Sequence, residues 1–177
     1  MPTRFRDDGS QPDVSWNHWL VRCPRCQGCA EVRHITQANR NYLGAVVHTL
    51  PARVVCRSCG YIHTVTEMAQ SGSTLPRDDS RDWVSGLPFW LHSACAGHIL
   101  WAWNASHLEF LERYVSADLR ERTPNVNRSL ASRLPRWLKA AKHRDEVLRC
   151  IRKLYATLPE WALAEAGAAG SSTEPTG

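Results

Sequence analysis

The stretch RCPRCQGCA, residues 22–30, contains three cysteines at intervals of three residues, Cys23, Cys26 and Cys29. Two overlapping Cys-x-x-Cys pairs share Cys26, so at most one of them can form the turn that presents two sulfurs to a single metal ion. Pro24 presets a turn between Cys23 and Cys26, which favours the first pair. The pair Cys26 and Cys29 remains an alternative, because no glycine directly follows Cys26 to adopt the left-handed backbone that such a turn commonly needs.

A second pair lies in CRSCGY, residues 56–61, where Gly60 directly follows Cys59. The first fifteen residues contain no apolar run, so we expect no secretory signal, reduced cysteines and a cytoplasmic protein. Paired Cys-x-x-Cys motifs then indicate metal ligands rather than disulfides. Four cysteines around a tetrahedral ion leave no open coordination position, so the metal should be structural. The predicted ligands of a Zn²⁺ ion are Cys23, Cys26, Cys56 and Cys59.

The arrangement of two Cys-x-x-Cys pairs separated by twenty-nine residues resembles the zinc-ribbon family over about residues 19–67. In that family each knuckle, the turn that carries one cysteine pair, tops a short β-hairpin, and the resemblance implies the same four ligands. The clusters AVV (45–47), RVVC (53–56) and YIHTVT (61–66) predict short strands. A β module with so little aliphatic core also needs a metal to stabilise it.

Beyond the ribbon, the composition changes at QSGSTLPRDDSRD, residues 70–82, which is typical of a linker. We therefore predict an α+β protein, with an N-terminal four-cysteine zinc ribbon of short antiparallel strands followed by a small domain of three or four helices. The predicted segments are a flexible lead-in over 1–15, the ribbon over 16–69, the linker over 70–86, the helical domain over 87–160 and a disordered tail over 161–177.

Within the predicted helical domain, the run 88–103 is apolar nearly all round and predicts a buried helix. The next helix should begin at a capping box formed by Ser106 and Glu109 and end near Thr123. A proline at position 135 should separate a short turn from a new helical start. Residues 144–158 carry the clearest apolar stripe. Much of 88–158 looks like the helical half of uncharacterised bacterial zinc-ribbon proteins, a resemblance that implies no activity.

The net charge of +5 is unevenly distributed. Residues 22–57 contain six arginines and one acid, Glu31, and residues 128–153 contain nine cations and two acids. Such segregation is typical of a surface that contacts phosphates. The predicted DNA- or RNA-binding residues are Arg25 and Arg57 in the knuckles, together with Arg136, Lys139 and Lys142 beside Trp137, an aromatic that could stack on a base. The alternatives are a solvated helix face, a protein-interaction adaptor and a thiol sensor that uses Cys29.

The sequence gives no support for an enzyme. It contains no nucleophile, phosphate-loop or dinucleotide motif. The segment His107–Glu109 has the His-x-Glu of zinc deaminases, but both cysteine pairs lie upstream of it. His92, Cys95 and His98 match no closed metal site and are interpreted as buried core residues. The longest apolar segment, residues 99–103, is far too short to span a membrane.

Overall fold

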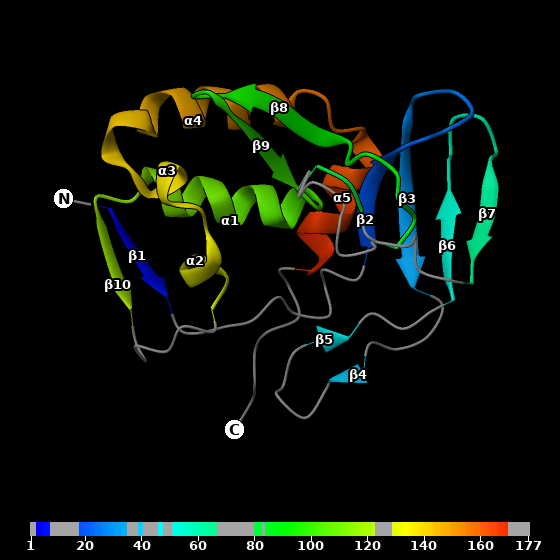
Figure 1. The fold of residues 1–177 in the computed structure, drawn as a ribbon, viewed down its shortest axis with the longest axis horizontal. Coiled ribbons are helices and arrows are strands. Elements are labelled where there is room, and N and C mark those ends of the chain that lie inside the picture. Colours follow the sequence, from blue (N-terminus) through cyan, green and yellow to red (C-terminus); the bar gives the residue numbers. More distant parts are fainter. Residues whose placement is uncertain are drawn as a thin grey trace.

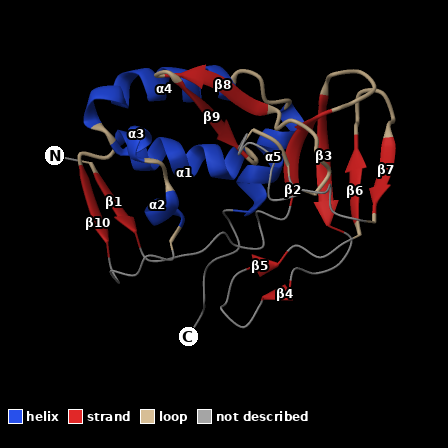
Figure 2. Cartoon of the chain, in the orientation of Figure 1, coloured by secondary structure: helices blue, strands red, loops and turns tan. Residues whose placement is uncertain are grey.

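The protein, described here by a computed structural model, combines helices with antiparallel sheets, which confirms the α+β class (Figures 1 and 2). The structure describes residues 3–7, 18–34, 39–40, 46–47, 51–66, 80–82, 84–122 and 129–169. The strands are β1 (Arg4–Asp7), β2 (His18–Arg22), β3 (Cys29–His34), β4 (Asn39–Arg40), β5 (Val46–Val47), β6 (Ala52–Val55), β7 (Ile62–Val65), β8 (Leu91–Cys95), β9 (His98–Ala102) and β10 (Leu119–Arg122). The helices are α1 (Ala105–Ser116), α2 (Leu130–Arg133), α3 (Arg136–Lys139), α4 (Arg144–Tyr155) and α5 (Glu160–Ala169).

The segment predicted as the ribbon contains a four-stranded antiparallel sheet in the order β2-β3-β6-β7, which we call the ribbon sheet (Figure 1). Strands appear where β-branched clusters predicted them, at β5, β6 and β7. Because side chains alternate along a strand, each strand contributes to two faces. One face carries Trp19, Val32 and Val54, which are buried. We call the opposite face the arginine face; it carries Leu20, Glu31, Arg33, Arg53 and Thr64.

The predicted helix over 88–103 is wrong, because this segment forms the hairpin of β8 and β9. Cys95 pairs with His98, so Ala96 and Gly97 form a two-residue turn, with φ angles of 51° and 76°. Positive φ at both turn residues is the geometry that matches the twist of paired strands, and it is incompatible with a continuing helix. The backbone N–H of Ala96 donates to Glu146 at 2.8 Å, which fixes the turn against α4.

The start of the chain is also more ordered than predicted. Residues 4–7 of the expected flexible lead-in form β1, which pairs in parallel with β10. Phe5 is buried and makes edge-to-face contacts with Phe110 and Tyr114 of α1, at centroid distances of 5.5 and 5.1 Å. The burial of Phe5 stabilises the short strand. The charged residues on either side of Phe5 in the sequence do not indicate this burial. Residues 8–15 lie outside the described part of the chain.

The first helix after the hairpin differs from the prediction at both of its ends, whereas the later ones follow it. Helix α1 is capped by Asn104, whose side-chain oxygen accepts the N–H of His107 at 2.9 Å, so the capping box at Ser106 and Glu109 is wrong. The predicted helix end near Thr123 is also wrong, because α1 ends at Ser116 and residues 119–122 form β10. Pro135 separates α2 from α3, and α4 matches the predicted stripe, as expected.

The expected disordered tail begins with a helix, α5, so that prediction is wrong for 161–169. Alanine has the highest helix propensity of all residues, and this segment is rich in it. Ala162 is buried in the main core, and Trp161 packs against the same core. Residues 170–177 lie outside the described part of the chain.

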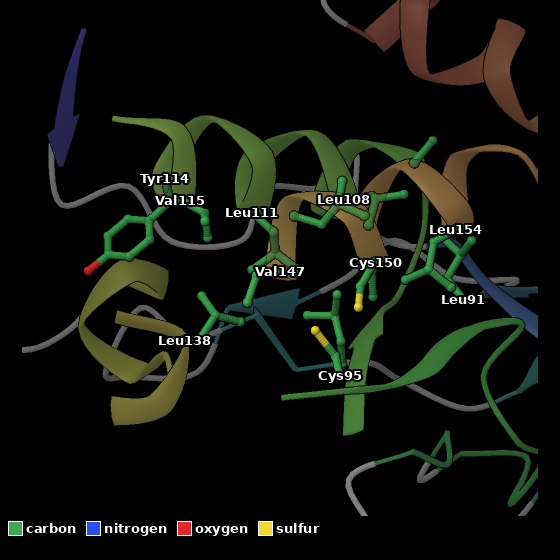
Figure 3. Packing of buried hydrophobic residues seen from close by; sticks show 14 of the residues in the cluster. Leu91, Cys95, Leu108, Leu111, Tyr114, Val115, Leu138, Val147, Cys150 and Leu154 are labelled. Carbon is green, nitrogen blue, oxygen red and sulfur yellow. The ribbon is translucent and has the colours of Figure 1, made fainter. Parts of the chain in front are cut away.

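Two apolar cores meet at β2. Leu20 belongs to the main core, which is built from β8, β9, α1 and α4 (Figure 3), whereas Trp19 and Val21 belong to the ribbon core. The ribbon core also receives Phe89 and the side chain of Trp101 from the hairpin region. Strand β2 therefore buries both of its faces, although it lies at the edge of the ribbon sheet.

Backbone hydrogen bonds complete this junction. The N–H of Leu20 donates to Trp103 at 2.7 Å, and the N–H of Trp90 donates to Leu20 at 2.8 Å. In the predicted linker, the buried carboxylate of Asp82 accepts the N–H groups of Val84 and Ser85. The domain boundary itself stays a prediction, because residues 70–79 lie outside the described part of the chain.

Candidate metal centre

The two knuckles lie at the same end of the ribbon sheet, one between β2 and β3 and the other between β6 and β7 (Figure 1). They share one hydrogen-bond pattern. In the first, Gln27 N–H donates to the Cys23 carbonyl at 2.9 Å, and Cys23 N–H donates to Gly28 at 2.8 Å. In the second, Gly60 N–H donates to Cys56 at 3.0 Å, and Cys56 N–H donates to the Tyr61 carbonyl at 2.8 Å. The two turns therefore present their cysteines in equivalent positions.

The first knuckle reaches this geometry without glycine at the left-handed position. Gln27 has a φ of 62° and Gly60 has a φ of 70°, so Gln27 takes the conformation that glycine takes in the second knuckle. A non-glycine residue in this region is uncommon. The glycine one position later has another role, since a Cβ at Gly28 would lie 3.3 Å from Cys26 Sγ. Gly28 thus permits close approach around the sulfurs.

The structure brings together the four cysteines that the favoured register names. The Sγ atoms of Cys23, Cys26, Cys56 and Cys59 all lie within 4.8 Å of one another. Cys23 Sγ is 3.7 Å from Cys59 Sγ, and Cys26 Sγ is 3.6 Å from Cys56 Sγ. A tetrahedral ion with metal–sulfur bonds of about 2.3 Å separates its sulfurs by about 3.8 Å. The cluster therefore has the donor set and the size to hold a metal ion.

Cys29 lies beside this group and outside it. Its side chain is buried, and burial, reinforced by the charges of Cys56 and Glu31, raises the pKa of its thiol to about 12. Its backbone carbonyl faces Cys56 Sγ at 3.7 Å. Its Sγ is not among the four clustered sulfurs. This placement argues against both the alternative register and the thiol sensor.

The pKa of the Cys56 thiol is shifted in the opposite direction. Burial disfavours its thiolate, but hydrogen bonds from the backbone N–H groups of Cys59 and Ser58 outweigh burial, so that its pKa falls to about 7. Backbone donors aimed at a sulfur stabilise its negative charge before any ion arrives. The lowered pKa belongs to Cys56 alone, because burial raises the pKa of Cys59, the other cysteine of this knuckle, to about 12.

The knuckle arginines differ in their contacts. Arg25 is exposed on the first knuckle. Arg57 donates to the buried carboxylate of Glu31 at 3.2 Å and lies over the ring of Trp161 in α5, 4.3 Å from its centroid. Arg57 therefore connects the second knuckle to the sheet and to α5, a structural role that the sequence does not reveal.

A pair of arginines that sequence reasoning did not single out lies next to this network. Arg33 and Arg53 are directly opposite each other on β3 and β6, and both are exposed. Arg33 donates to Glu31 at 2.7 Å, while Thr64 continues the exposed row on β7. The alternation of EVR and ARVV could have indicated that the charged residues share a face, but their register across strands is needed to make them neighbours.

The predicted cations of the helical part lie elsewhere. Figure 1 shows α3, which carries Arg136 and Lys139, at the opposite end of the molecule from β6 and β7. Arg136 and Lys142 are exposed, whereas the amino group of Lys139 donates to the Ser132 carbonyl at 3.0 Å. The structure does not bring these residues together with the knuckle arginines.

The second cluster of potential ligands does not assemble. Cys95 and Cys150 lie in the core between the hairpin and α4 (Figure 3), and the ring of His92 contacts the Phe89 carbonyl at 2.6 Å. Within the described residues, the four knuckle cysteines form the one group that could hold a metal ion. None of the helices in that part of the chain is long and apolar enough to cross a membrane.

No family model matches the sequence, and neither a curated protein nor a solved structure does.

Proposed function

We propose that this protein uses a structural zinc ion to fix its two knuckles and binds nucleic acid through the arginine face of the ribbon sheet. Four thiolates select soft or borderline ions, and zinc is the usual occupant of a closed tetrahedral site of this kind. The spacing of the four sulfurs supports this assignment. The ion would stabilise the fold and leave no coordination position for a substrate, so we propose no catalysis at this centre.

The observation that carries the proposed nucleic-acid binding is the direct opposition of Arg33 and Arg53. Like charges at directly opposed positions destabilise a sheet. Glu31 offsets the charge of Arg33, but the side chain of Arg53 has no hydrogen bond or ion pair with the described part of the chain. A phosphate bound between the two guanidinium groups would replace their repulsion with attraction.

The surroundings suit a polyanion. Three arginines, Arg33, Arg53 and Arg57, and one acid, Glu31, give this part of the sheet a net charge of +2 (3 − 1). The hydroxyl of Thr64 adds a neutral donor next to Arg53, and Arg25 extends the positive charge along the first knuckle. Guanidinium groups bind phosphate oxygens in a planar, two-pronged arrangement, so this row would follow a sugar–phosphate backbone without reading its sequence.

The test is a titration of the zinc-loaded chain with labelled single- and double-stranded DNA and RNA at several salt concentrations. We expect the logarithm of the affinity to fall linearly with the logarithm of salt, by about 0.7–0.9 for each phosphate contact. The double variant Arg33→Gln/Arg53→Gln should bind more weakly and lower the slope by roughly two contacts.

The matched control is Arg149→Gln/Lys153→Gln, which removes the same charge from exposed positions of α4. It should leave the slope nearly unchanged. Absence of binding at low salt, or an equal loss in the two double variants, would show that the arginine face is not a nucleic-acid surface.

One observation favours a protein-interaction adaptor as the second candidate. Ile62 is 64% exposed on β7, the outermost strand of the sheet. Large exposed apolar side chains on an edge strand are typical of pairing surfaces. This function predicts a partner protein whose binding tolerates salt and is lost in Ile62→Ser, whereas nucleic-acid binding should survive that substitution.

A further inference from the structure

A cavity of about 400 Å³ opens between β9, α1 and the connection from α2 to α3. Its floor is apolar, formed by Leu100, Leu111 and Leu138, each of which is almost fully buried. Its lining combines apolar and polar side chains, and its volume lies within the range of about 300–1,000 Å³ that is typical of small-molecule sites. None of the lining residues belongs to the ribbon sheet, so this cavity is separate from the arginine face.

Two indole rings, Trp101 and Trp137, line the cavity, and each is held by a second ring. Trp137 stacks on His98 at a centroid distance of 4.7 Å and an interplanar angle of 12°. Trp101 stacks on Phe89 at 5.2 Å and 10°. Aromatic side chains fixed in this way bind flat ligands without first losing rotamer freedom. The walls therefore favour a planar aromatic group.

The polar lining is cationic or neutral. Arg133 is exposed at the cavity, and none of the described residues that line it is acidic. His107 accepts the Trp103 N–H through Nδ1 at 3.2 Å, which places its own proton on Nε2. Burial also lowers the pKa of His107 to about 3, so the floor stays uncharged at neutral pH. The charge of the cavity is thus concentrated at Arg133, on its exposed side.

We propose that this cavity binds a single nucleotide, with the base against Trp137 and the phosphate on Arg133. Bases stack on indole rings with little dependence on their identity, and guanidinium groups bind phosphate in a two-pronged geometry. The nucleotide could be a free nucleoside 5′-monophosphate or an unpaired residue of a single strand, because both present the same base and phosphate. The site does not depend on the arginine face, so either proposal can fail alone.

The test uses calorimetric titration of the zinc-loaded full chain with AMP, adenosine, inorganic phosphate and a short single-stranded oligonucleotide. We expect saturable binding of AMP with one site per chain. Arg133→Gln should weaken AMP by roughly 10-fold or more, the effect of losing a charge-assisted contact, and should leave adenosine nearly unchanged. Trp137→Ala should weaken both ligands by roughly 5- to 100-fold, the range of a lost stacking contact.

Three further variants separate this site from other causes. Trp137→Phe keeps an aromatic ring and should retain most of the affinity, which distinguishes lost stacking from misfolding. Arg149→Gln removes an exposed arginine of α4, and Arg33→Gln/Arg53→Gln removes the arginine pair of the ribbon; both should bind AMP as the unmodified chain does. In the Arg33→Gln/Arg53→Gln variant, whose arginine face no longer contributes, tighter binding of the oligonucleotide than of AMP would identify a single strand as the source, and the reverse would identify a free nucleotide.

The proposal is overturned if neither AMP nor the oligonucleotide binds saturably to the Arg33→Gln/Arg53→Gln variant. It is equally overturned if folded Trp137→Ala binds AMP with unchanged affinity, or if Arg133→Gln weakens adenosine as much as AMP.

Discussion

At the scale of single residues, the metal centre depends on Gln27 and Gly28 as well as on its cysteines. Gln27 accepts a left-handed backbone so that the first knuckle turns as tightly as the second. Gly28 leaves room beside Cys26 Sγ that a Cβ would fill. These two positions place Cys29 on strand β3, where its thiol is buried in the main core, and this placement excludes it from the sulfur cluster.

Replacement of single cysteines tests this assignment. Cys29→Ser should retain one zinc per chain, because its side chain is not among the four clustered sulfurs. Cys26→Ser should lose most of its zinc, and the stability that the proposed structural ion contributes should be lost with it. Metal content by atomic emission measures both. A zinc-free Cys29→Ser protein would mean that the register of ligands is Cys26 with Cys29 after all.

At the scale of elements, helix α1 joins the hairpin to the sheet through its first turn. Asn104 caps the helix and also donates to the His18 carbonyl of β2 at 3.0 Å. His107, one turn later, accepts the backbone N–H of Trp103. Its ring packs against the indole ring of Trp103, with a centroid distance of 4.5 Å. The junction of α1, β9 and β2 thus contains a fully buried histidine that must remain neutral.

This histidine makes the stability of the zinc-loaded protein depend on pH. The pKa of His107 is lowered to about 3 in the folded chain, against about 6.5 when unfolded. The unfolded state therefore binds the extra proton between these values. Its contribution to stability is complete above about pH 6.5 and falls by about 1.4 kcal/mol per pH unit as the pH drops.

Urea unfolding at several pH values between 7 and 5 should accordingly show a loss of roughly 2 kcal/mol in the unmodified protein by pH 5. His107→Asn keeps an acceptor for the Trp103 N–H and cannot take up a proton, so its stability should change less over the same range. An equal fall in stability with pH in the two proteins would rule out His107 as the source of the pH dependence. Any acid-induced loss of zinc affects both proteins equally and cancels in the comparison.

At the scale of the whole molecule, the ribbon sheet and the helices are joined at strand β2, which contributes to both apolar cores. Strand β2 contributes Leu20 to the main core and Trp19 to the ribbon core, and its backbone bonds to residues on both sides of the hairpin. Arg57 adds a contact between the second knuckle and Trp161 of α5. Through Arg57, the knuckle that carries Cys56 and Cys59 therefore contacts a helix that lies more than a hundred residues later in the chain.

We accordingly predict one cooperative unfolding transition for the zinc-loaded protein, with helical circular dichroism and tryptophan fluorescence changing together. Structural zinc contributes on the order of 10 kcal/mol to folding, comparable to the whole stability of a domain. Removal of zinc by a strong chelator should therefore lower the stability of the helical part as well as that of the sheet. Two separate transitions, or helices whose stability does not change when the chelator is added, would show that the ribbon and the helices fold independently.

The sequence alone indicated those features that depend on neighbours along the chain. Two Cys-x-x-Cys turns, three short strands and the stripe of α4 follow from local spacing, and all of them appear in the structure. The spacing of apolar residues in 88–103 could not distinguish a helix from a hairpin, because an all-apolar run fits a buried helix and a buried hairpin equally well. The Ala96–Gly97 turn and the acceptor Glu146, fifty residues away, decide for the hairpin.

Tertiary structure alone decided the rest of the candidate sites. The opposition of Arg33 and Arg53 arises from strand register across a loop, and the cavity at Trp137 arises where residues from β9, α1 and α3 meet. The burial of Phe5 likewise requires α1, which follows it by about a hundred residues. Local spacing in a sequence specifies turns and periodic faces, whereas long-range packing specifies which faces meet, and the functional surfaces proposed for this protein belong to the second class.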